Sequence, residues 1–347
     1  MKGAVPGSIC IVMMSAVGDA VHVLPVINAL KRENPRTRIT WILQPGPATL
    51  VRGHRSVDEI IVFERSRGWR AFADIRAALA RRTFDLVINL QVYFKAGIVT
   101  AFARAPVKLG FDRARARDFN WMFTNRKIEA SPVRHVQDQY FEFLNALGVS
   151  PEPVEWDIGP WSDEREWQHE FVAKIGRPIA AIVVATSKAE KDWPAERWAE
   201  VCDLLYSRFG LQPVLVGGRS GREVAAERIV MEQTEHKPVS QLGSGLRKLV
   251  SILDASALVL SPDTGPLHMT VALDRPVISL LGYTNPRRTG PYRKFQDLVI
   301  DAYGDPGEDY PVSMENRTGR MPRISVADVI TKVELWEERY RGKQGAS

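Results

Sequence analysis

One stretch decides the fold: residues 8–33 read SICIVMM, then SAVGD, then AVHVLPVINALKRE. The run Ser8–Met14 is almost wholly apolar, which is typical of a strand buried on both faces. The small residues of Ser15–Asp19 follow as a turn, and the spacing beyond it predicts a helix over Ala20–Glu33. A strand that runs through a short turn into a helix is the building unit of a parallel α/β sheet.

The same alternation continues along the chain and predicts two domains. The first half adds predicted strands at Arg38–Leu43, Glu59–Phe63, Leu86–Leu90 and Val107–Gly110, and helices at Trp69–Arg82, Phe94–Arg104 and His135–Leu147. After a proline-rich linker, strands are predicted at Ile179–Val184, Pro213–Val216, Leu258–Leu260 and Val277–Leu281, and helices at Ala195–Phe209, Glu223–Gln233 and Leu246–Asp254. We therefore predict an α/β fold with two doubly wound parallel sheets, whose ligands lie beyond the strands' carboxyl ends in a cleft between the domains.

The predicted domains are residues 1–155 and 156–324, with the proline-rich linker Ser150–Pro160 at their junction. Residues 301–324 show no clear period and are predicted to form a loop. A C-terminal segment, 325–347, begins with an amphipathic helix over about Ser325–Tyr340, and we consider that it packs back on the first domain.

Composition excludes several classes of protein. The 347 residues are 45% hydrophobic and 25% charged, and the two cysteines have no metal-ligand spacing. The apolar runs fall short of the roughly 18–20 residues that a membrane-spanning helix needs, and the first run is too short for a signal peptide, so a cytoplasmic protein is expected. Residues 1–160 carry 22 Lys/Arg and 15 Asp/Glu (+7), whereas the remainder carries 25 and 26 (−1). This asymmetry reflects chance or solubility, or a first half that faces an anionic partner.

The turn after the first strand carries a candidate for proton transfer. Gly18 allows backbone and ligand to approach closely, and Asp19 stands at a helix N-terminus, which favours an ionised carboxylate. Such a carboxylate accepts a proton from an acceptor hydroxyl. The alternative is that Asp19 only caps the helix.

The second half carries two candidate anion sites at strand ends. Thr186, Ser187 and Lys191 follow its first strand and offer hydroxyls, amides and a compact cation for a phosphate. The most specific motif is SPDTGPLH, residues 261–268, in which Asp263, Thr264 and Gly265 open a helix and His268 lies one turn further on. Exposed amides at a helix N-terminus favour a diphosphate, so Asp263 is an unusual neighbour unless it binds sugar hydroxyls or caps the helix.

A weaker feature is the glycine-rich turn at 217–221, after which Glu223 is a candidate ligand for ribose hydroxyls. Acidic residues in a first helical turn are also common without any ligand. The sequence contains neither GxxxxGK[ST] nor GxGxxG, so a P-loop or a standard dinucleotide site is not supported.

These motifs together resemble the ADP-heptose:lipopolysaccharide heptosyltransferases, the family-nine glycosyltransferases of the GT-B fold, over about residues 8–300. Residues 15–25 look like the family's Ser-x-x-Gly-Asp-x-x-His-x-x-Pro motif, and residues 263–272 look like its Asp-Thr-Gly-x-x-His-x-x-x-Ala signature. Thr186 and Ser187 with Lys191–Pro194 resemble the heptosyltransferase I branch more than heptosyltransferase II.

The resemblance implies an inverting transfer of heptose from ADP-heptose to a Kdo residue of Kdo-lipid A, with no metal or other cofactor. Asp19 is then the general base and Lys191 steadies the departing ADP. The implied donor-binding residues are Thr186, Ser187, Lys191, Glu223, Asp263, Thr264, Gly265 and His268. The implied acceptor-binding residues are Gly18, Arg65, Arg67, Lys95, Arg113 and Arg117, in the basic half. A lipid acceptor also implies transient contact with the inner face of the cytoplasmic membrane.

Three alternatives remain open at this stage. The first is a related transferase that adds a second heptose or uses another nucleotide sugar. The second is a nucleotide-sugar epimerase or hydrolase of similar architecture. A non-enzymatic anion or nucleic-acid binder is the third, but basic residues and aromatics are not interleaved as in single-strand binders, and that reading leaves residues 261–268 unexplained.

Overall fold

The computed structural model describes residues 5–342, which form two compact units. The first unit runs to Pro132 and includes Val136–Ile158, and the second comprises Val133–His135 and the chain from Gly159 onward. Residues 1–4 and 343–347, at the outer ends of the predicted first domain and C-terminal segment, lie outside the described residues. The junction at Ile158 and Gly159 falls within the proline-rich linker.

The first unit is a six-stranded, all-parallel sheet in the order β3-β2-β1-β4-β5-β6. Its strands are β1 (Ser8–Val12), β2 (Arg38–Leu43), β3 (Glu59–Val62), β4 (Leu86–Asn89), β5 (Val107–Gly110) and β6 (Arg126–Lys127). Its helices are α1 (Val17–Glu33), α2 (Pro45–Val51), α3 (Trp69–Leu79), α4 (Phe94–Phe102) and α5 (Val136–Leu147), with short 3-10 turns at Arg65–Arg67 and Asn120–Phe123.

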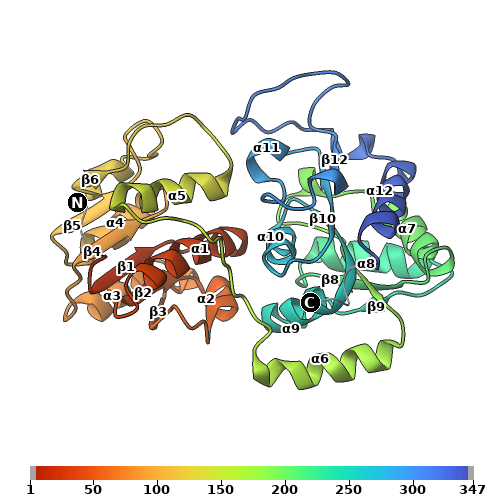
Figure 1. Ribbon diagram of the computed structural model, residues 1–347, viewed down its shortest axis with the longest axis horizontal. Helices are drawn as coiled ribbons and strands as arrows, with labels where there is room; N and C mark the ends of the chain where they lie inside the picture. Colours follow the sequence, from red (N-terminus) through yellow and green to blue (C-terminus); the bar gives the residue numbers. More distant parts are fainter. Residues whose placement is uncertain (1–4, 343–347) are drawn as a thin grey trace. The chain divides into compact units, whose positions relative to one another are not determined.

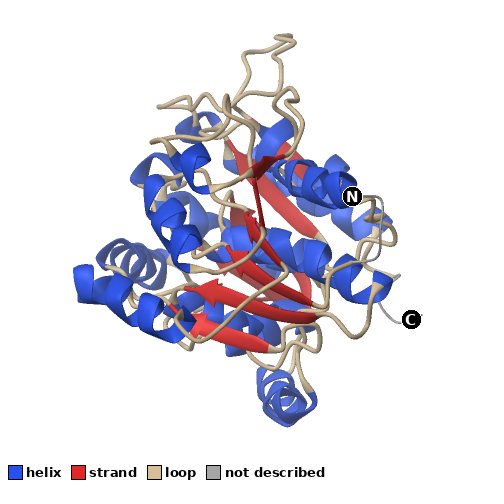
Figure 2. Ribbon diagram, turned by 90° about the vertical axis from the view of Figure 1, so that its left-hand side faces the viewer, coloured by secondary structure: helices blue, strands red, loops and turns tan. Residues whose placement is uncertain are grey.

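Helices cover both faces of this sheet (Figures 1 and 2). Cys10 and Val12 of β1 pack with Ile75 of α3 and Val99 of α4, whereas α1 packs against α2 and α5. Successive side chains of a strand point to opposite faces, so β1 needs apolar residues at every position. This is why Ser8–Met14 is a nearly continuous apolar run.

The second unit repeats the architecture, with strand order β12-β11-β10-β7-β8-β9 and every pairing parallel. Its strands are β7 (Ile179–Val183), β8 (Gln212–Val216), β9 (Val239–Ser240), β10 (Ser256–Pro262), β11 (Val277–Leu281) and β12 (Val299–Asp301). Its helices are α6 (Ser162–Ile175), α7 (Ala195–Ser207), α8 (Gly221–Gln233), α9 (Leu246–Ala255), α10 (Gly265–Ala272), α11 (Pro286–Thr289) and α12 (Val326–Arg339), with 3-10 turns at Ala189–Lys191, Gln296–Leu298 and Met321–Arg323.

The C-terminal helix α12 belongs to the second unit, which corrects the expectation that it packs on the first. Val329, Val333 and Trp336 are fully buried in the core that α7 and the second sheet share. The Trp336 indole Nε1 also donates a hydrogen bond to the backbone oxygen of Ala257, at 3.1 Å. The sequence pattern identified the apolar stripe of α12 correctly. The domain on which this stripe packs was predicted wrongly, because it is the second unit and not the first.

The structure adds several short elements that the sequence pattern did not indicate. Helix α2 begins with a proline, which is compatible with a first helical position. Helix α6 is mostly polar and buries only Gln168 and Phe171, so its periodicity is weak. Strands β6 and β9 have two residues each, too few for an alternation to be visible. Among residues 5–342, no helix has the length and apolar character needed to cross a membrane.

The packing of α12 predicts the effect of one substitution. We expect Trp336→Ala to lower the free energy of unfolding of the second unit by roughly 3–5 kcal/mol, because it removes a fully buried indole from the core. Urea denaturation followed by circular dichroism measures this, with exposed Glu338→Ala on the same helix as the control. A Trp336→Ala protein as stable as the control would contradict this placement of α12.

Candidate active site

The topology of each sheet defines one position where a ligand is expected. In the first unit the chain leaves β1 toward β2 on one side and later returns to β4 on the other, so β1 and β4 flank the switch point. In the second unit β7 and β10 are neighbours in the same way. Ligands of open parallel sheets bind outside the carboxyl ends of the strands at such points. The residues singled out after β1, β7 and β10 lie at these ends.

Asp19 is the third residue of α1, directly after β1. Its Oδ2 accepts a hydrogen bond from the backbone N–H of Ala16, at 2.9 Å, and its Oδ1 accepts one from the hydroxyl of Tyr140 on α5, at 3.2 Å. The first contact is the helix-capping role, and the second fixes the other oxygen. The carboxylate is thus held in one orientation at the β1 end.

Two side-chain amides, of which Gln137 is buried and Gln91 half-buried, hold the surroundings of Asp19. Gln137 of α5 bonds to the His22 ring and donates to the His22 backbone oxygen, at 3.0 and 2.8 Å. Gln91, beyond β4, accepts from the N–H of Met14 and donates to the oxygen of Ser15, at 3.0 and 2.8 Å. These contacts connect the turn that carries Gly18 and Asp19 to α5 and to β4. Sequence reasoning missed Tyr140, Gln137 and Gln91, because nothing local links them to residues so far away.

A largely buried ion pair joins the segments that follow β7 and β10. The Lys191 ammonium lies 2.7 Å from Oδ2 of Asp263, and the His268 ring nitrogen Nε2 lies 3.6 Å from Oδ1. Thr284, after β11, donates its hydroxyl to the same carboxylate. Burial by itself raises the pKa of Asp263, but His268 and Lys191 outweigh it and hold that pKa well below its usual range. Three of the predicted donor residues therefore converge, and Thr284 joins them.

The loop after β7 is shaped by a second network. Thr186 is buried, its N–H donates to Asp192 at 2.6 Å, and its hydroxyl bonds to the backbone of Lys188. Arg222 from the first turn of α8 reaches the Thr186 carbonyl, at 2.7 Å, and forms an ion pair with Asp192. Ser187 is exposed at the head of this loop. The predicted residues Thr186, Ser187 and Lys191 thus share one short segment after β7, in which Asp192 and Arg222 hold Thr186.

The other predicted donor residues differ in their structural role. Thr264 is the N-cap of α10, with no side-chain cap hydrogen bond, and Gly265 is the first helical residue. This leaves the Thr264 hydroxyl uncommitted to capping. In contrast, Glu223 accepts the N–H groups of Gly218 and Ser220 at 2.6 and 2.8 Å, as part of the capping box of α8. The position of Glu223 is thus explained by capping, and its ribose role stays a prediction.

The basic residues predicted for the acceptor follow three strands of the first unit: a 3-10 turn carries Arg65 and Arg67, the first turn of α4 carries Lys95, and the loop after β5 carries Arg113 and Arg117. Arg65, Lys95 and Arg117 are exposed, and Arg67 forms an ion pair with Asp74 of α3, at 2.6 Å. Arg113 lies over the Trp121 ring, 4.5 Å from its centroid.

The neighbouring Arg115 has a different role from these exposed residues. Its side chain is only 11% exposed, and it forms ion pairs with Asp112 and Glu142. In this loop Arg115 is thus structural, whereas Arg113 and Arg117 on either side of it are exposed. The loop is dense in arginine partly because one of them holds it in place.

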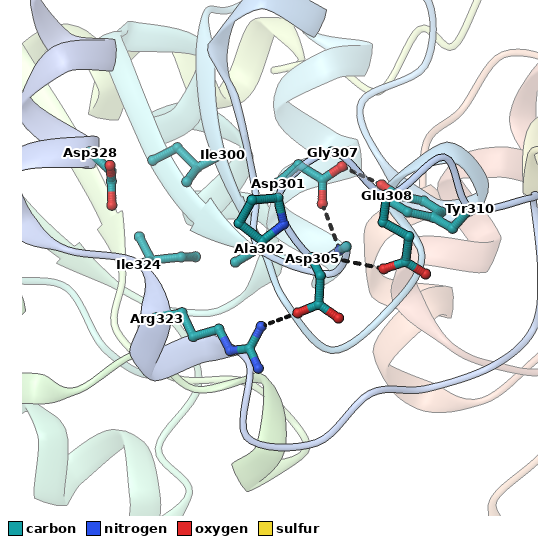
Figure 3. A pocket seen from close by; sticks show the side chains of 12 residues that line it. Ile300, Asp301, Ala302, Asp305, Gly307, Glu308, Tyr310, Arg323, Ile324 and Asp328 are labelled. Atoms are coloured by element: carbon teal, nitrogen blue, oxygen red, sulfur yellow. Dashed lines mark hydrogen bonds and ion pairs between the residues drawn. The ribbon is translucent and has the colours of Figure 1, made fainter.

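A cavity of about 500 Å³ lies elsewhere in the second unit, beside the loop that follows β12 (Figure 3). Its acidic lining is cross-linked: Arg323 reaches Asp305, and Tyr310 donates its hydroxyl to Asp301. The lining contains none of the predicted donor residues, and its acidic side chains do not favour a diphosphate. Within residues 5–342, no group of three or more His, Cys, Asp or Glu side chains is arranged to hold a metal ion.

Comparison with known proteins identifies the family. The sequence profile of glycosyltransferase family 9 (heptosyltransferase) matches residues 72–315. The chain belongs to glycosyltransferase family 9. It is 29% identical to the lipopolysaccharide core heptosyltransferase OpsX of Haemophilus influenzae, over 95% of this chain and 96% of the relative. It is 30% identical to lipopolysaccharide heptosyltransferase 1 of Salmonella typhimurium, over 83% of this chain and 92% of the relative.

Solved structures of this glycosyltransferase family agree with the fold. The Escherichia coli heptosyltransferase WaaC with ADP is 25% identical, with a TM-score of 0.74 over 96% of this chain and 99% of that one. A family 9 glycosyltransferase of Veillonella parvula has a TM-score of 0.82 over 96% of this chain and 98% of that one, at 24% identity. These findings confirm the predicted GT-B class and the resemblance to heptosyltransferase I. The protein is a glycosyltransferase of the heptosyltransferase type.

The ion pair of the second unit predicts a dependence of stability on pH. Because the folded-state pKa of Asp263 lies below its ordinary value of 3.8, its carboxylate stabilises the fold above that pH, and the contribution is lost as the pH falls further. At low pH the protonated Asp263 of the wild type is neutral, as the asparagine of the variant is at every pH. Lys191 then lacks an anionic partner at position 263 in both proteins. The difference in unfolding free energy between wild type and Asp263→Asn should therefore shrink between about pH 5 and pH 2.

Urea denaturation across this pH range measures the difference. Exposed Asp163→Asn on α6 serves as the control for general acid effects. A difference between wild type and Asp263→Asn that stays constant down to the lowest pH would contradict the ionised pair.

Proposed function

We propose that this family 9 enzyme transfers heptose from ADP-heptose to a Kdo residue of Kdo-lipid A. The second unit binds the donor, and the first unit binds the acceptor and supplies the base. The observation that carries the proposal is the oriented Asp19 carboxylate at the β1 switch point of a family 9 chain. Support for the donor comes from WaaC, which is described with ADP and with ADP-2-deoxy-2-fluoro heptose.

The chemistry of transfer follows from groups whose positions are described above. An acceptor hydroxyl attacks the anomeric carbon, its proton passes to Asp19, and the bond from that carbon to the diphosphate oxygen breaks with inversion. An aspartate held by two donors keeps its orientation while it accepts the proton. The ADP that leaves carries the bonding electron pair and needs positive charge near its phosphates.

Lys191 and the start of α10 supply that positive charge. Two contacts of the Lys191 ammonium go to the carboxylate and the backbone oxygen of Asp263, at 2.7 and 3.3 Å. An ammonium has three N–H donors, so a phosphate oxygen is accommodated as a further partner. Asp263 then positions Lys191 and is available to sugar hydroxyls. In this proposal Thr186, Ser187, Thr264, Gly265 and His268 complete the donor site, and the transfer needs no metal.

The acceptor side of the proposal uses the excess of basic residues in the first half. Arg65, Lys95 and Arg117 follow β3, β4 and β5, so all three leave the carboxyl edge of one sheet. Guanidinium and ammonium groups there suit the carboxylates of Kdo and the phosphates of lipid A. We further propose that the enzyme acts at the inner face of the cytoplasmic membrane, where such an acceptor is exposed.

The role of Asp19 predicts a loss of turnover without a loss of donor binding. We expect Asp19→Asn to lower kcat by roughly 10²–10⁴-fold, because the variant lacks a base of suitable strength. Measuring ADP release with ADP-heptose and Kdo-lipid A tests kcat, and calorimetric titration with ADP tests binding.

A matched control separates catalysis from helix capping. Asp328 caps α12 in the same way, through the N–H of Ser325 at 2.8 Å, so Asp328→Asn removes a similar carboxylate from a helix N-terminus. It should keep wild-type turnover. An Asp19→Asn enzyme with near-normal kcat and normal ADP binding would remove Asp19 as the base.

A further inference from the structure

The first unit exposes large apolar side chains beside its basic loops. Tyr93 and Phe94 at the start of α4 are 52% and 45% exposed, and Phe119 and Met122 before β6 are 67% and 64% exposed. Soluble proteins seldom leave several large apolar side chains together in water without a partner. We call these four residues with Lys95, Arg113 and Arg117 the aromatic–basic patch.

Contacts within the first unit bring together the elements that carry the patch. Helix α4 packs against the turn Asn120–Phe123, next to β5 and β6 (Figure 1). The rings of Phe94 and Phe123 meet edge to face, 5.5 Å apart. A side chain at Gly97 would lie within 2.2 Å of the Phe123 ring, so this glycine allows the close approach.

Buried hydrogen bonds fix the segment that carries Phe119. Asn120 is 1% exposed, accepts a hydrogen bond from Asn89, at 3.1 Å, and donates one to the backbone oxygen of Tyr93, at 2.7 Å. Phe119 itself has a left-handed backbone, with φ of 59°, which a bulky residue rarely adopts. The fold thus holds an aromatic side chain in solvent at this position. A residue such as asparagine would adopt the same left-handed backbone at a lower cost in energy.

Charge indicates what covers this surface. Residues 91–127 contain eight Lys/Arg and two Asp/Glu, a net charge of +6. Arg113 lies over the Trp121 ring, and Lys95 follows Phe94. Aromatic rings favour the boundary between lipid headgroups and acyl chains, and nearby Lys and Arg attract anionic headgroups. A bilayer that contains anionic lipid offers an apolar boundary region to the exposed apolar side chains and negative charge to Lys95, Arg113 and Arg117.

We propose that the aromatic–basic patch docks the enzyme on the surface of an anionic lipid bilayer, with Phe119 and Met122 inserted at the headgroup level. This inference deepens the proposed function by assigning the membrane-contact surface. Strand β5, which leads into the patch, lies two strand spacings from β1, about 10 Å along the sheet. A lipid-linked sugar held at the patch is therefore near the β1 end that carries Asp19.

Vesicle sedimentation without any substrate tests the docking surface directly. The wild-type protein should bind vesicles of phosphatidylcholine mixed with phosphatidylglycerol, and binding should weaken at about 1 M salt, where the Debye length is about 3 Å. The Phe119→Asn/Met122→Ser double variant should bind roughly tenfold more weakly, because it loses both inserted side chains. Asparagine tolerates the left-handed backbone at position 119, so the fold is retained.

Two controls distinguish the patch from general hydrophobicity and from catalysis. Val224→Ser/Met314→Ser removes two exposed apolar side chains of the second unit and should bind vesicles like the wild type. On a water-soluble Kdo acceptor without acyl chains, the Phe119→Asn/Met122→Ser enzyme should keep wild-type turnover. If the wild-type enzyme does not glycosylate that acceptor, the proposed function is overturned, and the docking result still stands.

Three outcomes would overturn the docking proposal. The first is equal vesicle binding by the wild type and the Phe119→Asn/Met122→Ser variant, or no binding by either. The second is a dimer in light scattering that this variant abolishes, which would make the patch a contact between two copies. The third is salt-sensitive binding to a single-stranded oligonucleotide without binding to vesicles.

Discussion

The largely buried pair of Lys191 and Asp263 is the interaction on which the proposed donor site depends. It joins the ends of β7 and β10, the two strands at the switch point of the second sheet, and it includes His268 and Thr284. A buried charge without a partner is costly, so each member fixes the others. The pair also keeps an ammonium group near the start of α10, where an anionic leaving group is best stabilised.

The first unit holds its proposed base by hydrogen bonds at the corresponding switch point. The backbone N–H of Ala16 and the Tyr140 hydroxyl each donate to one oxygen of Asp19, which fixes the orientation of the carboxylate. The two switch points thus carry different chemistry on the same topology. In the proposed reaction, the second unit stabilises the charge of the leaving group and the first unit takes up the proton.

The sequence predicted the elements whose signal is local and failed where the deciding contact is distant. Buried parallel strands such as β1 and β7 were recognisable, because every residue must be apolar. The predicted donor residues Lys191, Asp263 and His268 converge because they follow adjacent strands. Tyr140 lies 121 residues from Asp19, and no periodicity links the two. The face covered by α12 also depends on Ala257 and the second core, which its own stripe does not specify.

The most direct test of the central claim is a donor screen with a Kdo-lipid acceptor. Purified enzyme is incubated with ADP-heptose and, separately, with other ADP-, GDP- and UDP-linked sugars, and the glycosylated lipid is followed by mass spectrometry. We expect transfer of heptose from ADP-heptose that depends on the acceptor, with little transfer from the other donors. Efficient transfer from a different nucleotide sugar, or consumption of ADP-heptose without any acceptor, would contradict it.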